Sequence, residues 1–141
     1  MMSPNNPTGA LAKVVITTIG TLHAPGGPVE DGLYFDLSDK LRDPADDPAM
    51  RYLTGLDPKV RDHVLATPGA MPVVERIAES AKAVLQSYAD KRHKLVKVTV
   101  ACRGGRHRSV AIAEAAAQYL RGDGIGVEVD HQHIDRPVVE G

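Results

Sequence analysis

Runs of β-branched and other apolar residues recur along the chain at lengths typical of strands. Within them the side chains alternate or form short continuous apolar stretches, as strands with at least one buried face require. Glycine, proline or charged residues border each run. The pattern predicts four strands, at residues 13–18, 32–37, 95–101 and 127–131.

Other segments carry apolar residues at every third or fourth position, which is the period of an amphipathic helix. This spacing predicts one helix from residue 72 to about 90 and a second, rich in alanine, from 109 to 121. A shorter helix is predicted from Pro58 to about Ala66, with Asp57 as its N-cap and the proline in its first position. Residues 42–48 are polar, contain two prolines and are expected to form a connection.

Strands that alternate with helices predict an α/β fold, a layered and mostly parallel sheet with helices packed on it. The chain has 141 residues, of which 43% are hydrophobic, and this suits a single domain with a real core. We expect a flexible leader at 1–12, the domain at 13–137 and a short tail at 138–141.

Residues 102–109 read Cys-Arg-Gly-Gly-Arg-His-Arg-Ser and join the predicted strand 95–101 to the predicted helix 109–121. Two glycines allow successive backbone N–H groups to converge, and a helix N-terminus adds the positive end of its dipole. A strand, glycine-rich loop and helix in this order predict a phosphate-binding corner. The candidate ligand-binding residues are Arg103, Gly104, Gly105, Arg106, His107, Arg108 and Ser109, with Asp36 and His23 as further members.

Charge is segregated along the chain although the net charge is only −1. Residues 91–113 contain seven Lys or Arg and no Asp or Glu, whereas residues 30–47 are mainly acidic. The small net charge excludes a global attraction to nucleic acid or membrane, so an anion would bind through the local basic segment. The basic and acidic segments are expected to face each other, within one chain or across subunits.

The single cysteine, Cys102, excludes an internal disulfide and a thiolate zinc cluster. We expect a reduced thiol and a cytoplasmic protein, because the first residues resemble no signal peptide and no run has transmembrane length. No cofactor or metal is predicted. His131 and His133 would lie on one face if the last strand continued, but no third ligand accompanies them, and we interpret them as surface residues.

The spacing Cys102, five residues, Arg108, Ser109 also fits the pattern of cysteine-dependent phosphatases. In such a loop a thiolate attacks phosphorus while N–H groups and the arginine stabilise the phosphoryl oxygens. Asp36, Asp39 and Asp43 are candidates for the general acid. The alternative role of Cys102, as a small buried residue that closes a strand, is favoured.

Three blocks together resemble the C-terminal domain of the RapZ family of RNase-adaptor proteins. They are Tyr34-Phe35-Asp36, Leu53-Thr54-Gly55-Leu56-Asp57 and the series Gly104, Gly105, His107, Arg108, Ser109, Val110, and the resemblance extends from about residue 14 to 137. It implies binding of an amino-sugar phosphate and of small regulatory RNA, and self-association. The sequence departs from the family pattern where Arg103 replaces a threonine, where Ser38 replaces an arginine, and in His131-Gln132-His133, which lacks an arginine.

We therefore expect a regulatory module that binds a phosphorylated small molecule, an amino-sugar phosphate or a nucleotide, with RNA as a further partner and a homo-oligomeric state. No membrane partner is expected. With no Trp, one Phe and four Tyr, any RNA binding would be mostly electrostatic. The alternative function is a cysteine-dependent phosphatase. His107 would either donate to the phosphate when protonated or hold the loop through a neutral hydrogen bond.

Overall fold

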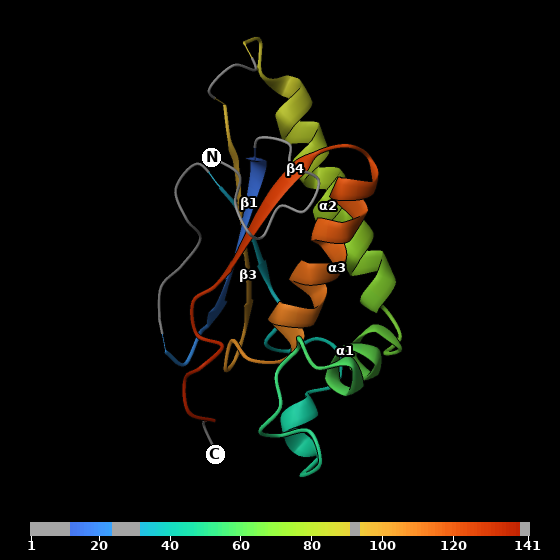
Figure 1. Ribbon diagram of the computed structural model, residues 1–141, viewed down its shortest axis with the longest axis vertical. Coiled ribbons are helices and arrows are strands. Elements are labelled where there is room, and N and C mark those ends of the chain that lie inside the picture. The colour runs from blue at the N-terminus through green and yellow to red at the C-terminus, as the bar shows by residue number, and fades with distance from the viewer. Residues whose placement is uncertain (1–11, 24–31, 91–93, 139–141) are drawn as a thin grey trace.

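A computed structural model describes residues 12–23, 32–90 and 94–138 (Figure 1). The predicted leader lies outside these residues except for Ala12, and the predicted tail lies outside them except for Val138. In chain order the elements are β1 (Ala12–Gly20), β2 (Leu33–Asp36), η1 (Pro44–Asp46), α1 (Pro58–Leu65), α2 (Ala70–Ser87), β3 (Val96–Cys102), α3 (Arg108–Gly122) and β4 (Gly126–His131). The predicted strands and helices are confirmed, and η1 is a single 3₁₀ turn within the connection expected at 42–48.

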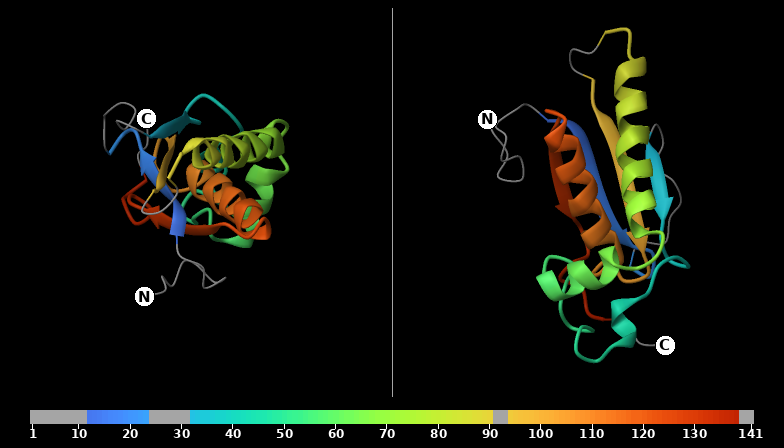
Figure 2. Two further views of the ribbon diagram at one scale, coloured as in Figure 1. Left: turned by 90° about the horizontal axis from the view of Figure 1, so that it is seen from above. Right: turned by 90° about the vertical axis from the view of Figure 1, so that its right-hand side faces the viewer.

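The four strands form one sheet in the order β2-β3-β1-β4, and every neighbouring pair is parallel. The helices pack on one face of this sheet, with α2 and α3 running along the strands and α1 across one end (Figures 1 and 2). The predicted α/β fold with a mostly parallel sheet is therefore confirmed. None of the described helices combines the length and apolar composition needed to cross a bilayer.

Small side chains on α3 let the helices approach the sheet and each other closely. The buried face of α3 consists largely of alanines around Ile112 and Leu120, and α2 meets it with Val74, Ile77 and small residues. Each large apolar side chain buried in this way stabilises the fold by roughly 1.5–3 kcal/mol. The helical spacing in the sequence identified this core correctly.

The strand register brings the carboxyl ends of three strands to one level. Gly20 of β1 pairs with Cys102 of β3, and Asp36 of β2 pairs with Ala101. The polypeptide segments η1, the start of α1, the start of α3 and the residues after β4 gather at this same end (Figure 1). Ligand sites of open parallel sheets occur at this end because the connecting loops converge there.

Two glycines bring the loop after β3 into backbone contact with the end of β1. A Cβ on Gly20 would lie 2.4 Å from the carbonyl carbon of Gly104, and one on Gly105 would lie 2.5 Å from the nitrogen of Gly20. Gly105 also has a φ of 71°, in the left-handed region that favours glycine. The loop is therefore held against the sheet by a contact that leaves no room for side chains at either position.

The chain after β4 turns back across the ends of the strands instead of continuing the sheet. The ring nitrogen Nδ1 of His133 accepts the backbone N–H of Gly20 at 2.9 Å, whereas His131 lies between Thr18 and Glu114. The expectation that the two histidines share one face was wrong because β4 ends at His131 and a turn follows. The interpretation of His133 as a surface residue was also wrong, because this residue is buried. Within the part of the chain that the structure describes, no group of three or more side chains is arranged to hold a metal ion.

Replacement of Gly105 by alanine should destabilise the fold by roughly 2–4 kcal/mol, the sum expected for a strained φ and a steric overlap. Gly104→Ala is the matched control, because a Cβ there meets no atom within 4 Å. We expect the control to change the free energy of unfolding by less than about 1 kcal/mol. Urea unfolding of both variants measures the difference, and equal stabilities would contradict the contact.

The free energy of unfolding should fall as the pH drops below about 6.5. Burial, followed by the charges of Arg136 and His23, lowers the pKa of His133 from the ordinary value of 6.5, so the unfolded chain takes up the proton more readily. A protonated ring also cannot accept the N–H of Gly20. His133→Asn should show a flatter decline between pH 7.5 and 5 in urea unfolding. An unchanged pH dependence in this variant would exclude His133 as a contributor.

Candidate functional site

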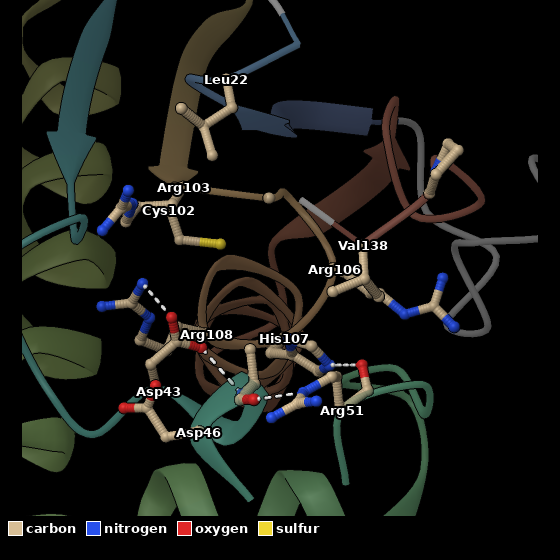
Figure 3. A pocket seen from close by; sticks show the side chains of 13 residues that line it. Leu22, Asp43, Asp46, Arg51, Cys102, Arg103, Arg106, His107, Arg108 and Val138 are labelled. Atoms are coloured by element: carbon tan, nitrogen blue, oxygen red, sulfur yellow. Dashed lines mark hydrogen bonds and ion pairs between the residues drawn. The ribbon is translucent and has the colours of Figure 1, made fainter. Parts of the chain in front are cut away.

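A cavity of about 310 Å³ lies where the loop after β3 faces the connection that contains η1 (Figure 3). We call it the loop cavity. Its walls come from four parts of the chain: the residues after β1, the segment 43–51, the loop 102–108 and the C-terminal segment. The lining residues are Leu22, Asp43, Ala45, Asp46, Arg51, Cys102, Arg103, Gly104, Arg106, His107, Arg108, Pro137 and Val138.

Most of the predicted ligand-binding residues lie at this cavity. The lining residues among them are Cys102, Arg103, Gly104, Arg106, His107 and Arg108. Gly105 and Ser109 do not line the cavity but contact the sulfur of Cys102. Asp36 and His23 do not line it. The sequence motif therefore identified one wall of the cavity, and the opposite wall comes from segments distant in the sequence.

The thiol of Cys102 sits at the floor of the loop cavity. Its residue is only 2% exposed and closes β3, yet the side chain is among those that line the cavity. The N–H of Gly105 donates to Sγ at 3.3 Å, and Sγ lies 3.2 Å from the hydroxyl oxygen of Ser109. The sulfur is thus set between a backbone donor and a hydroxyl at the start of α3.

The guanidinium of Arg108 is buried and organises the loop that follows β2. One terminal nitrogen donates to the carbonyl oxygens of Leu37, Ser38 and Lys40 at 3.0, 3.2 and 2.9 Å. The other donates to the carboxylate of Asp43 at 3.2 Å. A buried cation is tolerated only when it is paired and hydrogen-bonded, and these acceptors meet that need.

This arrangement changes the interpretation of Arg108 as a planar fork that grips a phosphate. Both terminal nitrogens already have protein acceptors, so a bidentate grip would require their release. The remaining nitrogen, Nε, is buried and has no hydrogen-bond partner among the described residues. Nε is thus covered by protein atoms, and the bonds of the terminal nitrogens make Arg108 a structural part of the cavity wall.

Arg106, like Arg108, donates hydrogen bonds to backbone carbonyl oxygens of other segments. Its guanidinium donates to the carbonyl oxygens of Leu53 at 3.0 Å, of Ile134 at 3.3 Å, and of Tyr52. It thereby ties the loop to two segments that lie far from it in the sequence. Arg103, by contrast, is exposed while it lines the cavity, and no protein acceptor holds its guanidinium among the residues described.

His107 precedes α3 and is 5% exposed. Burial is the main cause that lowers the pKa of its imidazole, and the nearby charge of Asp43 opposes this only in part. The ring is therefore neutral at pH 7, and Nε2 donates to the carbonyl oxygen of Arg51 at 2.9 Å. Of the two roles expected for His107, the structure favours the neutral hydrogen bond that holds the loop.

Asp46 and Arg51 are lining residues that the sequence alone did not identify. They belong to the connection around η1, where Asp43 caps the turn by accepting the N–H of Ala45 at 3.0 Å. Nε of Arg51 donates to the carbonyl oxygen of Ala45 at 2.8 Å. Such a connection has no periodic signal, and only its acidic character, which made Asp43 a candidate general acid, and the nearby block at residues 53–57 pointed to this segment.

The remaining candidates lie outside the loop cavity. Asp36 is exposed and accepts the N–H of Ser38, and Asp39 is exposed and pairs with Lys40. His23 lies with its ring centroid 5.7 Å from that of His133. Of the three aspartates considered as general acids, Asp43 alone lines this cavity.

A second cavity, of about 460 Å³, adjoins the first and shares Asp43, Asp46 and Arg108 with it. Its other lining residues include Asp39, Asp47 and His63. The bond between Arg108 and Asp43 thus forms the wall between a cavity with several arginines and a more acidic one. The acidic and basic segments of the sequence do meet within one chain at this bond.

Comparison with protein families matches residues 12–135 to the family described as the RapZ C-terminal domain. Among curated proteins, a nucleotide-binding protein of Rubrobacter xylanophilus is 44% identical over 117 residues, which are 83% of this chain and 37% of that protein. A nucleotide-binding protein of Sphingopyxis alaskensis is 37% identical over 118 residues, 84% of this chain and 37% of its own. One from Clostridium acetobutylicum is 29% identical over 130 residues, 92% of this chain and 44% of its own.

The chain therefore spans less than half the length of these curated relatives. The match to the family covers every described helix and strand, and it includes the loop 102–109 and the segment 43–51, which supply most of the cavity's lining residues. This extent agrees with the resemblance deduced from the sequence motifs. The chain belongs to the RapZ C-terminal domain family.

Proposed function

We propose that this chain is a regulatory module that binds a phosphorylated small molecule, a nucleotide or an amino-sugar phosphate, in the loop cavity. The observation that carries the proposal is the place of the cavity: it lies beside the glycine loop and the N-terminus of α3, at the carboxyl end of a parallel sheet. The N–H groups of the first helical turn have no partners within the helix and favour an anion.

The side chains at the cavity suggest different roles in such binding. The exposed guanidinium of Arg103 is placed to pair with the phosphate, and the buried guanidinium of Arg108 adds a fixed positive charge to the wall. Arg106 and His107 position the loop through bonds to carbonyl oxygens. The carboxylate of Asp46 can accept hydrogen bonds from hydroxyl or amino groups on the rest of the ligand.

The family relationship supports the same ligand class. The relatives' names describe nucleotide-binding proteins, but this chain covers less than half of each, so the nucleotide site of those proteins need not lie in the shared part. The amino-sugar phosphate is the ligand that the RapZ resemblance implies. RNA binding and self-association belong to the proposal on the same basis, and the scarcity of aromatic residues makes any RNA contact mainly electrostatic.

Titration of isotope-labelled protein, followed through the amides of Gly104 and Gly105, tests the ligand class. We compare inorganic phosphate, an amino-sugar phosphate, ATP and a short RNA hairpin, and expect saturable shifts with at least one phosphorylated small molecule. Arg103→Ala should weaken that binding by roughly tenfold, because it removes an exposed charged contact. Arg76→Ala, which removes an exposed arginine from α2, should leave it unchanged.

The two variants separate a local contact from a general effect of charge. Equal weakening by both would mean that the anion responds to net charge and not to this cavity. An absence of shifts with all four ligands would contradict the proposed function and leave the loop with a structural role.

A cysteine-dependent phosphatase is the second candidate, favoured by one observation: the thiol of Cys102 and the carboxylates of Asp43 and Asp46 line the same cavity. The binding module predicts no turnover of an aryl phosphate by the unmodified chain. A phosphatase predicts turnover that vanishes in Cys102→Ser, because the hydroxyl cannot replace the thiolate as nucleophile. Release of the aryl alcohol, measured for both proteins at equal concentration, decides between the two functions.

A further inference from the structure

We infer that Leu22, Pro137 and Val138 form an apolar shelf in the loop cavity that binds the base of a nucleoside monophosphate and so selects this ligand over a phosphorylated sugar. This inference rests on the proposed function, because it assumes that the cavity binds a phosphate and names the rest of the ligand. It makes Leu22 the residue that determines the specificity of the cavity.

Leu22 is a large apolar side chain that remains exposed on a cavity wall. It is 45% exposed and lines the loop cavity, and in Figure 3 its side chain extends towards Cys102. Single exposed leucines are common on the outer surface of proteins, where no ligand covers them. In a cavity the same apolar area lies where a ligand can remove it from water.

Backbone hydrogen bonds hold Leu22 beside Arg103, whose guanidinium has no protein acceptor among the described residues. The N–H of Thr21 donates to the carbonyl oxygen of Cys102 at 2.9 Å, and the N–H of Leu22 donates to the carbonyl oxygen of Arg103 at 3.0 Å. These bonds extend the contact between β1 and β3 past the ends of both strands. A ligand whose phosphate pairs with Arg103 therefore places its adjoining group next to Leu22.

The other two members of the shelf belong to the segment after β4, which meets the end of β1. Nδ1 of His133 accepts the N–H of Gly20 at 2.9 Å, and this bond anchors the turn that precedes Pro137 and Val138. Both of these residues line the cavity, and neither side chain carries a hydrogen-bonding group. The shelf is thus built from two separate segments, and its side chains offer a ligand only apolar contacts.

The side of the cavity formed by the connection around η1 has the opposite character. Asp46 is exposed there, and within the described part of the chain no hydrogen bond or ion pair involves its carboxylate. The cavity therefore offers a cation at Arg103, an acceptor at Asp46 and apolar surface at the shelf. Its volume of about 310 Å³ lies at the lower end of the range for small-molecule sites.

A nucleoside monophosphate presents a matching group to each of these three features. Its phosphate pairs with Arg103, its ribose hydroxyls donate to Asp46, and its flat base covers the shelf. A sugar phosphate carries hydroxyl or amino groups around its whole ring. Some of these groups would lose water against the shelf without gaining a hydrogen bond, which disfavours such a ligand.

The first test compares AMP with ribose 5-phosphate, which lacks the base, by titration of protein labelled in its amides and leucine methyl groups. AMP should bind about tenfold more tightly, because its base covers apolar area that ribose 5-phosphate leaves in water. AMP should also shift the methyl signals of Leu22 through the ring current of the base, whereas ribose 5-phosphate should not. Equal affinities, or AMP binding without a shift of these signals, would overturn the proposal.

Leu22→Ser should weaken AMP binding about fivefold and leave ribose 5-phosphate binding unchanged, since it removes apolar area but no charge. Leu56→Ser is the matched control, because Leu56 is 54% exposed and does not line the cavity, and both affinities should be unchanged. Leu22→Phe should bind AMP at least as tightly as the unmodified chain does. Equal weakening of both ligands in Leu22→Ser, or weak AMP binding in Leu22→Phe, would contradict a role of Leu22 in specificity.

Inorganic phosphate and an amino-sugar phosphate separate this inference from the proposed function. If neither of them, nor AMP or ribose 5-phosphate, shifts the amides of Gly104 and Gly105, the proposed function and the shelf both fail. If phosphate and the amino-sugar phosphate bind while AMP binds no better than ribose 5-phosphate, the proposed function stands and the shelf alone is wrong.

Discussion

The contact between the backbones of Gly20 and Gly105 is the constraint on which the site depends. It presses the loop after β3 against the end of β1, and it does so at the level where Gly20 pairs with Cys102. Once the loop is fixed there, the thiol faces the cavity and α3 starts directly beside it. A side chain at either glycine would lift the loop from the sheet and separate the helix N-terminus from the cavity.

Two arginines of this loop then hold other segments of the chain against it, and these segments form the remaining walls of the cavity. Arg108 gathers the carbonyl oxygens of the loop after β2, and Arg106 gathers those of Tyr52, Leu53 and the C-terminal segment. Polar carbonyl groups in irregular loops need partners when they are buried, and a guanidinium with five N–H donors supplies several at once. The basic character of the motif therefore serves first to assemble the surrounding loops, and among its three arginines only Arg103 has no protein acceptor within the described residues.

Much of the fold was predictable from the sequence. Strands and helices bury side chains at regular intervals, so apolar residues recur along the sequence with the same period. The strands and the helices α2 and α3 follow from spacing, and Asp57 caps α1 as expected, accepting the N–H of Lys59 at 2.9 Å. The glycine loop was recognisable because a strand and a helix flank it. These features depend on residues that are close together in the chain.

The opposite wall of the cavity depends on contacts between residues far apart in the chain, and here prediction failed. Nothing in the composition of residues 37–51 reveals that their carbonyl groups turn towards Arg108, or that Asp46 and Arg51 reach the cavity. The turn that carries His133 back to Gly20 also leaves no local signal, and alternation suggested a continued strand instead. The sequence showed that the motif is basic, but it did not show that Arg106 and Arg108 are bonded to protein carbonyl oxygens.

The loop cavity carries negative charge as well as positive charge. Two carboxylates line it beside the arginines, so a ligand that carries only negative charge meets repulsion from Asp46 as well as attraction from Arg103. A molecule with a phosphate at one end and hydroxyl or amino donors at the other satisfies both sets of groups. The walls thus offer negative as well as positive groups, and the negative ones, Asp43 and Asp46, belong to the segment that the sequence motif did not include.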